Sequence, residues 1–308
     1  MNDVSGKGDQ ADTLREMART ARKNHAPDAS HAGGSSEQKG IRVISVTRGK
    51  GGVGKSNVVT NLAISLSNQG KKVLILDADL GLGNLDVLLG LSPVYNLNHV
   101  LSGEKGISEI LIDGPAGIKI IPAGSGVQDF TNLGQHEKLR LLDELDMLEE
   151  NFDVMIVDTE AGISENVTYF AAAAQEIIVV VTPEPTSITD AYALIKLLAT
   201  QYSEHHFKVL VNIAKDSEDA LEVFRKLANV AGRFLDISLD YLGCVVRDDK
   251  LVEAVKRQKA VSDLFPESEA ATCFTTLAKR VIENTRQTRL KGNIQFFFRQ
   301  MLDNPVGE

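Results

Sequence analysis

The sequence predicts an α/β fold: a doubly wound, mostly parallel sheet with helices on both faces. Short apolar runs rich in β-branched residues recur along the chain, and such runs are typical of strands buried on both faces. Segments with a helical period separate these runs, so strands and helices alternate. A glycine-rich loop also joins the first strand to the first helix. In sheets of this kind, ligands bind at the carboxyl ends of the strands.

The elements follow one another over residues 40–285, which we expect to form one folded domain. The expected strands are Ile41 to Thr47, Val73 to Asp77, Ile118 to Pro122, Val154 to Asp158, Ile177 to Thr182, Val209 to Ile213 and Tyr241 to Val246. The helices expected between them include Ser56 to Asn68, Glu137 to Glu149, Ser187 to Glu204 and Glu218 to Ala231. The sequence has no internal repeat of fixed period and no second apolar domain.

The composition limits the classes of function. The chain has 308 residues, of which 43% are hydrophobic and 24% charged, so it can bury one large core. A net charge of -9 provides no general basic field for nucleic acid. The two cysteines, Cys244 and Cys273, have no metal-binding spacing, which argues against an iron-sulfur protein. No apolar run is long enough to span a bilayer and no signal peptide is present, so we expect a cytoplasmic protein.

The loop after the first strand has the pattern of a phosphate-binding P-loop. Residues 49–56 read GKGGVGKS, which satisfies G-x-x-x-x-G-K-[ST] between a strand and a helix. Backbone N–H groups of such a loop point at the phosphates, helped by the positive end of the helix. Lys55 is expected to neutralise phosphate and Ser56 to give its hydroxyl to Mg²⁺. The predicted binding residues are Lys50, Gly51, Gly52, Val53, Gly54, Lys55, Ser56 and Asn57.

Lys50 is a second lysine at the start of this loop. One subunit does not need it to hold phosphate, so its charge is free for another purpose. Lys50 to Ser56 resembles the KGGVGK[ST] loop of the MinD and ParA family of deviant Walker ATPases, a group of P-loop NTPases in the SIMIBI class. In that family the first lysine reaches the nucleotide of a partner subunit. The resemblance therefore implies a homodimer with ATP at its interface.

Three carboxylates follow predicted strands. Asp77 and Asp79 end the second strand, and Asp158 ends the fourth, where it fits a Walker B carboxylate that acts on Mg²⁺ through water. By resemblance to the family, Asp79 orients the attacking water and Asp77 holds the magnesium shell or its hydrogen bonds. The alternative is that Asp77 and Asp79 only cap a helix that begins near Asn84.

The segment after Asp158 departs from the family pattern. The family commonly has proline in D-x-P-A-G, where this chain has Glu160. A carboxylate pointing at the phosphates would be repelled, since like charges about 4 Å apart cost about 4 kcal/mol at an effective dielectric of 20. We therefore expect Glu160 to face water or a regulator.

The base end of the site is predicted from the later strands. The segments Thr182 to Ala191 and Val211 to Lys215 resemble those of the family, in which the residue at the position of Asn212 reads adenine. A strand-end asparagine also occurs in plain turns. All these groups position the nucleotide and neutralise its charge without covalent catalysis. The expected activity is therefore slow, regulatory ATP hydrolysis.

The tail, residues 286–308, contains a predicted amphipathic helix. Its large apolar side chains fall at i, i+3, i+4, i+7 and i+8: Ile294, Phe297, Phe298, Met301 and Leu302. A stripe this short does not span a bilayer but suits a helix lying on an anionic membrane surface. One tail should bind marginally, whereas two tails in a dimer bind by avidity. The alternative is that the stripe packs on the core of the protein itself.

Residues 1–39 are polar and are expected to form a flexible arm. Within the arm, Gln10, Leu14 and Arg15 lie in a D-Q-A-x-x-L-R segment that resembles the activating segment of the flagellar branch of the family, called FlhG, YlxH or FleN. In that branch the segment stimulates the GTPase FlhF, with the glutamine as the key residue. The alternative is an inert leader.

The resemblance as a whole implies a MinD-like ATPase with ATP and Mg²⁺ as cofactors. It is expected to associate reversibly with the inner membrane near a cell pole and to regulate flagellar number and placement through an FlhF-like GTPase. Further implied partners are flagellar switch-complex proteins or a flagellar transcription activator. The alternatives are a MinD-type division-site regulator and a ParA-type DNA-partitioning ATPase. The negative net charge of the chain argues against direct DNA binding.

Overall fold

The computed structural model describes residues 41–79, 83–122, 140, 143, 144, 148 and 151–283. An eight-stranded sheet lies at the centre, in the order β3-β4-β2-β5-β1-β6-β7-β8. Neighbouring strands pair in parallel except at the edge, where β3 and β4 are antiparallel. The strands are β1 (Arg42–Arg48), β2 (Val73–Ala78), β3 (Ile112–Asp113), β4 (Lys119–Ile121), β5 (Val154–Ala161), β6 (Glu176–Val181), β7 (His206–Ala214) and β8 (Ser238–Val246).

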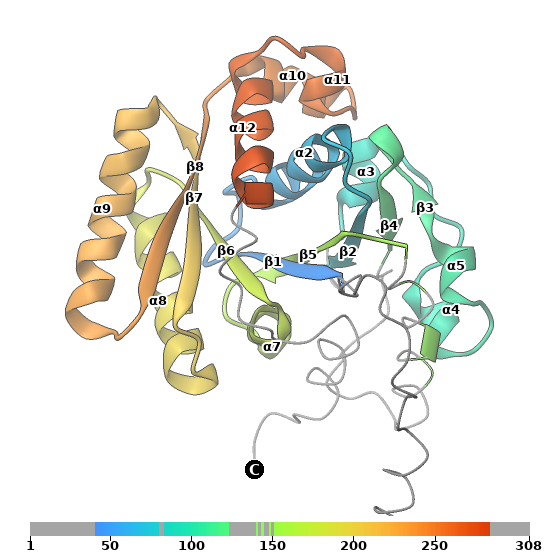
Figure 1. The fold of residues 1–308 in the computed structure, drawn as a ribbon, viewed down its shortest axis with the longest axis horizontal. Helices are drawn as coiled ribbons and strands as arrows, with labels where there is room; N and C mark the ends of the chain where they lie inside the picture. The colour runs from blue at the N-terminus through green and yellow to red at the C-terminus, as the bar shows by residue number, and fades with distance from the viewer. Residues whose placement is uncertain are drawn as a thin grey trace, which may run out of the picture. The chain divides into compact units, whose positions relative to one another are not determined.

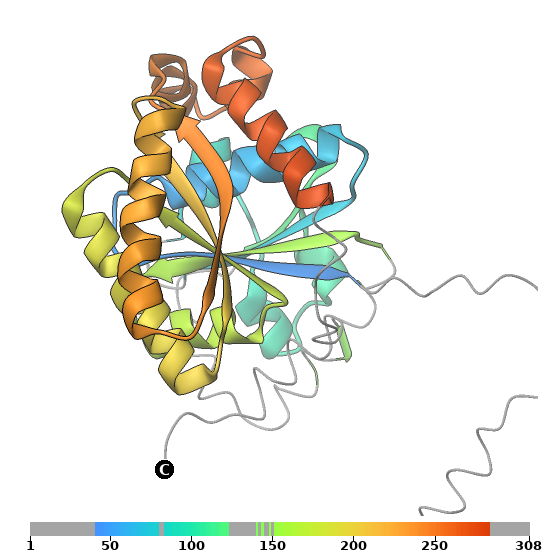
Figure 2. The same ribbon diagram turned by 60° about the vertical axis from the view of Figure 1, so that its left-hand side comes forward.

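Helices cover both faces of this sheet (Figures 1 and 2). The helices on one face are α2 (Lys55–Asn68), α3 (Leu85–Leu89), α10 (Asp249–Lys256), α11 (Val261–Leu264) and α12 (Glu269–Glu283). Those on the other face are α4 (Leu97–Leu101), α5 (Ile107–Ile110), α7 (Glu165–Ala173), α8 (Pro185–Tyr202) and α9 (Ser217–Phe234). A short 3-10 helix, η1 (Pro115–Gly117), precedes β4. The predicted doubly wound fold is therefore confirmed.

The central strands are buried on both faces, as their uninterrupted apolar sequences predict. In β1, Ile44 and Val46 pack in the core under α2, whereas Val43 packs in the core of the opposite face. Because β1 lies between β5 and β6, the loop that follows it emerges at the middle of the sheet edge. This position brings that loop between the ends of several other strands.

Each of the seven predicted runs lies in an observed strand, with ends that differ by up to three residues. β3 is not predicted by the sequence, because it has only two residues and therefore no periodicity. The predicted arm (1–39), the tail (286–308) and most of the predicted helix Glu137 to Glu149 lie outside the described residues. Within the described ranges, no helix is long and apolar enough to cross a membrane.

A buried charge cluster near the amino ends of the strands connects three strands and one helix. Glu176, at the start of β6, is 7% exposed and forms ion pairs with Arg42 of β1 and Lys208 of β7. Arg42 also donates to the carbonyl of Val281 near the end of α12, at 2.5 Å. Burial alone would raise the pKa of Glu176, but the hydrogen bonds and charges of Arg42 and Lys208 outweigh it and lower that pKa.

Replacing this carboxylate tests the contribution of the cluster. Glu176→Gln should lower the free energy of unfolding by about 2 to 4 kcal/mol, because two cations are left buried without a charged partner. Urea unfolding at pH 7 measures the change. Glu222→Gln is the matched control, since Glu222 pairs with Lys226 on the exposed surface of α9, and its midpoint should not move. Equal midpoints for both variants would contradict the assigned role of Glu176.

Candidate functional site

The predicted site residues of the described segments meet at the carboxyl edge of the sheet. Asp158 of β5 lies opposite Val46 of β1 on one side and opposite Asp77 of β2 on the other. The P-loop follows β1 at this edge, and Asn212 lies near the end of β7. The structure thus brings together the P-loop, the carboxylates and the asparagine, although the sequence separates them by up to 160 residues or so.

The P-loop takes its shape from glycines that no other residue could replace without strain. Gly54 has φ 78°, which places it in the left-handed region, and it is the N-cap of α2. The first turn of α2 is closed by the N–H of Val58, which donates to the carbonyl of Gly54 at 3.0 Å. Gly49 lies so close to the backbone of Asp190 and Ala191 that a Cβ atom would collide with it. The loop therefore starts against α8 and ends at the positive end of α2.

Lys55 is completely buried, with its ammonium group on the carboxylate of Asp158. Asp158 itself is 1% exposed. Two buried charges of opposite sign stabilise each other where either alone would be strongly unfavourable. An ammonium group has three N–H donors, so Lys55 can bind a phosphate oxygen while it keeps Asp158.

Asp77 is the second buried carboxylate of the site. Burial, reinforced by the charge of Asp158, raises the pKa of Asp77 to about 7. Its Oδ1 atom accepts from the backbone N–H of Asp79 at 3.2 Å. The N-cap residue of α3 is Asn84 and neither aspartate. Asp77 lies opposite Asp158, and Asp79 follows directly after the end of β2.

Lys50 is paired within its own chain, which differs from the expectation of a free charge. Its ammonium group forms an ion pair with Glu184 and a 2.8 Å hydrogen bond with the hydroxyl of Thr186. Glu184 precedes α8 and Thr186 lies in its first turn. The segment Thr182 to Ala191, expected at the base end, thus contacts the P-loop. The sequence analysis did not identify these two partners, because no spacing rule links residues this far apart.

Glu160 is partly exposed, and it forms no ion pair with the other described residues. A hydrogen bond attaches the turn after Glu160 to the end of β1, since the N–H of Gly162 donates to the carbonyl of Arg48 at 3.1 Å. This loop is therefore anchored to the strand that carries the P-loop, while its carboxylate is partly open to solvent.

Asn212 contacts the P-loop directly. Its Nδ2 atom donates to the carbonyl of Val53 at 2.8 Å, and a Cβ atom on Gly54 would lie 2.5 Å from Nδ2. Asn212 is 3% exposed, and its Oδ1 atom is buried with no hydrogen-bond partner among the described residues. The fixed amide nitrogen leaves this oxygen as an acceptor for a ligand. The exocyclic amino group of adenine is a donor of the required kind, whereas guanine presents an acceptor at the same position.

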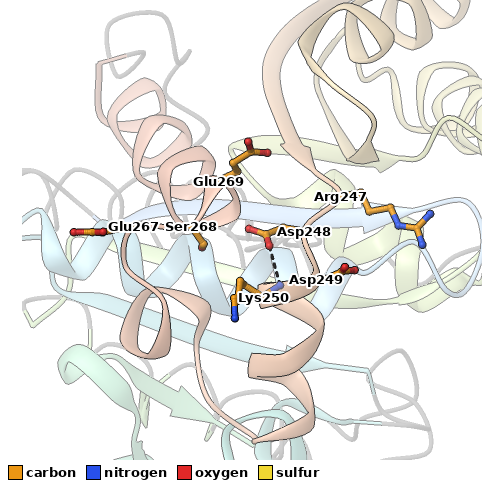
Figure 3. Close-up of a pocket in the computed structure, with 7 residues that line it drawn as sticks. All are labelled: Arg247, Asp248, Asp249, Lys250, Glu267, Ser268 and Glu269. Atoms are coloured by element: carbon orange, nitrogen blue, oxygen red, sulfur yellow. Dashed lines mark hydrogen bonds between the residues drawn. The ribbon is translucent and has the colours of Figure 1, made fainter.

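A cavity of about 550 Å³ lies beyond the end of β8 (Figure 3). The N–H of Arg247 donates to the carbonyl of Ala214 at 2.8 Å, which places the start of this cavity beside the end of β7. Asp248 caps α10 through the N–H of Lys250 and also accepts from the N–H of Ala270 in α12. The lining residues, none of them predicted from the sequence, are Arg247, Asp248, Asp249, Lys250, Glu267, Ser268 and Glu269.

The residues at this edge fit a magnesium nucleotide. The P-loop and Lys55 suit the phosphates, and the unpaired oxygen of Asn212 suits an adenine. No group of three or more His, Cys, Asp or Glu side chains in the described ranges could hold a metal by itself. Mg²⁺ commonly takes one or two protein ligands, with phosphate oxygens and water completing its shell. Ser56, Asp77 and Asp158 are the side chains that would provide these ligands or bind the waters.

Comparisons with known proteins agree with this geometry. A family model described as an AAA domain matches residues 41–210. The antiactivator FleN of Pseudomonas aeruginosa is 43% identical over 86% of this chain and 95% of its own length. The flagellum site-determining protein YlxH of Helicobacter pylori is 32% identical over 85% of this chain and 90% of its own length. A chain of the MinC:MinD cell division protein complex of Aquifex aeolicus superimposes with a TM-score of 0.63 and 28% identity, covering 81% of this chain and 98% of that chain.

The geometry of Asn212 predicts base selectivity. Asn212→Ala should weaken ATP binding about 10-fold or more, because the adenine amino group loses its acceptor and the carbonyl of Val53 loses its donor. The preference for ATP over GTP should fall as well. Isothermal titration calorimetry with each nucleotide measures both effects. Asn229→Ala, on the exposed side of α9, is the control, and an unchanged ratio of the two affinities in Asn212→Ala would refute the assignment.

Proposed function

We propose that this chain, which belongs to the MinD/ParA-type P-loop ATPases and to their flagellar FleN/YlxH branch, is an ATP-controlled dimerisation switch that regulates flagellar number and placement. The ATPase character follows from the family. The observation that best supports a switch is the presence of two lysines in one P-loop. Lys55 is buried on Asp158, whereas Lys50 lies at the rim of the same loop, where its side chain is 27% exposed.

The phosphate site performs positioning and charge neutralisation. Bound Mg²⁺-ATP supplies the bond that is hydrolysed, and the metal neutralises phosphate charge. The N–H groups of Gly51 to Gly54 and the ammonium of Lys55 would hold the phosphates, while the hydroxyl of Ser56 and the carboxylate of Asp158 would bind the metal or its waters. Asp77, beside Asp158, would accept hydrogen bonds from the same waters.

Lys50 is the residue proposed to join two subunits. Its partners, Glu184 and Thr186, lie at the exposed start of α8. Reaching the nucleotide of a second subunit requires Lys50 to exchange this ion pair for phosphate oxygens. A phosphate carries more negative charge than one carboxylate, so the exchange is favourable only when a partner presents ATP. The ion pair with Glu184 therefore disfavours dimers that lack nucleotide.

Hydrolysis ends the dimeric state. Asp79 lies at the end of β2, next to the buried Asp77, and is proposed to orient the attacking water. Glu160 lies on the loop after β5, partly open to solvent, where a regulator can reach it. The proposed turnover is slow and regulatory.

The two ends of the chain are proposed to carry out the functions that dimerisation controls. In the ATP dimer, two tails present Ile294, Phe297, Phe298, Met301 and Leu302 to the anionic inner membrane, and binding through two tails is much tighter than through one. The arm with Gln10, Leu14 and Arg15 is proposed to stimulate an FlhF-like GTPase. The protein would then cycle between cytoplasm and membrane near a cell pole, with flagellar switch-complex proteins or a transcription activator as further partners.

A division-site role is the second candidate, favoured by the likeness to the MinC:MinD complex of Aquifex aeolicus. The identity to FleN and YlxH is higher, at 43% and 32% against 28%, and it extends over most of both chains. These values favour the flagellar branch over the division-site regulators.

The proposed role of Asp79 can be tested by uncoupling hydrolysis from dimerisation. Asp79→Ala should lower the ATPase rate about 100-fold or more, because a positioned general base or water-orienting group is lost. The variant should still form a dimer with ATP. Phosphate release and light scattering after size exclusion measure the two properties. Asp113→Ala, a change at an exposed carboxylate on β3, should leave both unchanged. A normal rate in Asp79→Ala would remove this residue from the reaction.

A further inference from the structure

Two hydrogen bonds fasten the junction between α10 and α11 to elements of the nucleotide site. The Nε2 atom of Gln258 donates to the carbonyl of Val87 in α3 at 2.8 Å. Three residues later, the N–H of Val261 donates to Oδ1 of Asn61 in α2 at 3.0 Å. Asn61 is 3% exposed, and α2 is the helix that begins at the P-loop. The junction thus contacts both helices that lead directly out of the phosphate site.

Gln258 adopts an unusual backbone conformation to make this contact. It follows α10 with φ 54°, in the left-handed region where glycine or asparagine is the usual residue. Lys259 closes the helix end by donating to the carbonyl of Ala254 at 3.1 Å. A glycine would satisfy this helix end without strain, but it would have no side chain to reach Val87. The contact with α3 is therefore an additional property of the glutamine, beyond capping.

α3 is placed to respond to the phosphate site. A Cβ atom on Gly83 would lie 2.9 Å from Oδ2 of Asp77 and 3.2 Å from the carbonyl of Asp79. α3 begins two residues after Gly83, at Leu85, and has only five residues, so its ends move together. At its far end, Gly90 lies against Gln258, since a Cβ atom on Gly90 would be 3.6 Å from that of Gln258. The carboxylate of Asp77, Gly83, α3 and Gln258 form a continuous series of contacts.

We propose that the α10–α11 junction transmits the nucleotide state of the site to α10, α11 and α12 through the bond from Gln258 to Val87. Any shift of Asp77 and Gly83 on nucleotide binding displaces α3, and displacement of Val87 breaks or remakes this bond. α12 packs against both α2 and β8 and ends at Glu283, the last described residue before the tail. The inference rests on the proposed function, because it requires that the P-loop binds ATP.

Hydrogen-deuterium exchange of the full chain, alone and with Mg²⁺ and a non-hydrolysable ATP analogue, tests the proposal. In the parent protein, nucleotide should change exchange both in the P-loop peptide (49–60) and in the junction peptide (255–264). Gln258→Gly removes the side chain and suits the left-handed backbone, and Gln258→Asn keeps an amide one methylene too short to reach Val87. In both variants the P-loop change should remain and the junction change should disappear.

Gln69→Ala is the matched control. Gln69 also donates from its side-chain amide to a backbone carbonyl of the C-terminal helices, that of Thr275 at 3.1 Å, but from the end of α2 far from the P-loop. This variant should retain both changes. A junction change that persists in both Gln258 variants, or is absent from the parent protein while its P-loop responds, overturns the inference and leaves the proposed function intact. Absence of the P-loop response in the parent protein overturns both.

Discussion

The buried ion pair between Lys55 and Asp158 is the contact on which the rest of the site depends. It joins the first residue of α2 to Asp158 in the second half of β5, at the centre of the sheet. Since both groups are almost completely buried, the charge of each stabilises that of the other. The pair therefore keeps a positive charge beneath the glycine loop and a carboxylate beside it. Asp77 lies next to the same carboxylate, and its burial, reinforced by the charge of Asp158, raises its pKa to about 7.

α8 and the P-loop form the second structural unit of the proposed switch. Gly49 packs against the backbone of α8, and Lys50 binds Glu184 and Thr186 at the start of that helix. A change in the position of Lys50 must therefore alter contacts at the exposed end of α8. The two lysines of the loop have different roles. Lys55 is buried and pairs with Asp158 inside the subunit, whereas Lys50 lies at the rim and is proposed to contact the nucleotide of a partner subunit.

The fold and the phosphate site could be predicted because each depends on the pattern of residues within short, contiguous segments of the sequence. Uninterrupted β-branched runs identified the buried strands, and the spacing of glycines and lysines identified the P-loop. The remaining features depend on contacts between distant residues. The pairing of Lys50 with Glu184 and the bond from Asn212 to Val53 arise only when the loop after β1 meets the start of α8 and the end of β7. The cavity beside Arg247 arises only when the segment after β8 meets the start of α12. The strand β3 has only two residues, which is too few to show the alternation of side chains that is typical of a strand.

Liposome co-sedimentation tests most directly the proposal that ATP turns this chain into a dimer that binds the membrane. The full chain and a chain ending before Asn293 would be compared on anionic vesicles with ATP, with ADP and without nucleotide. We expect the full chain to pellet with ATP alone, and truncation to abolish pelleting without loss of ATP binding. Pelleting that is independent of nucleotide, or that survives truncation, would contradict the proposed switch.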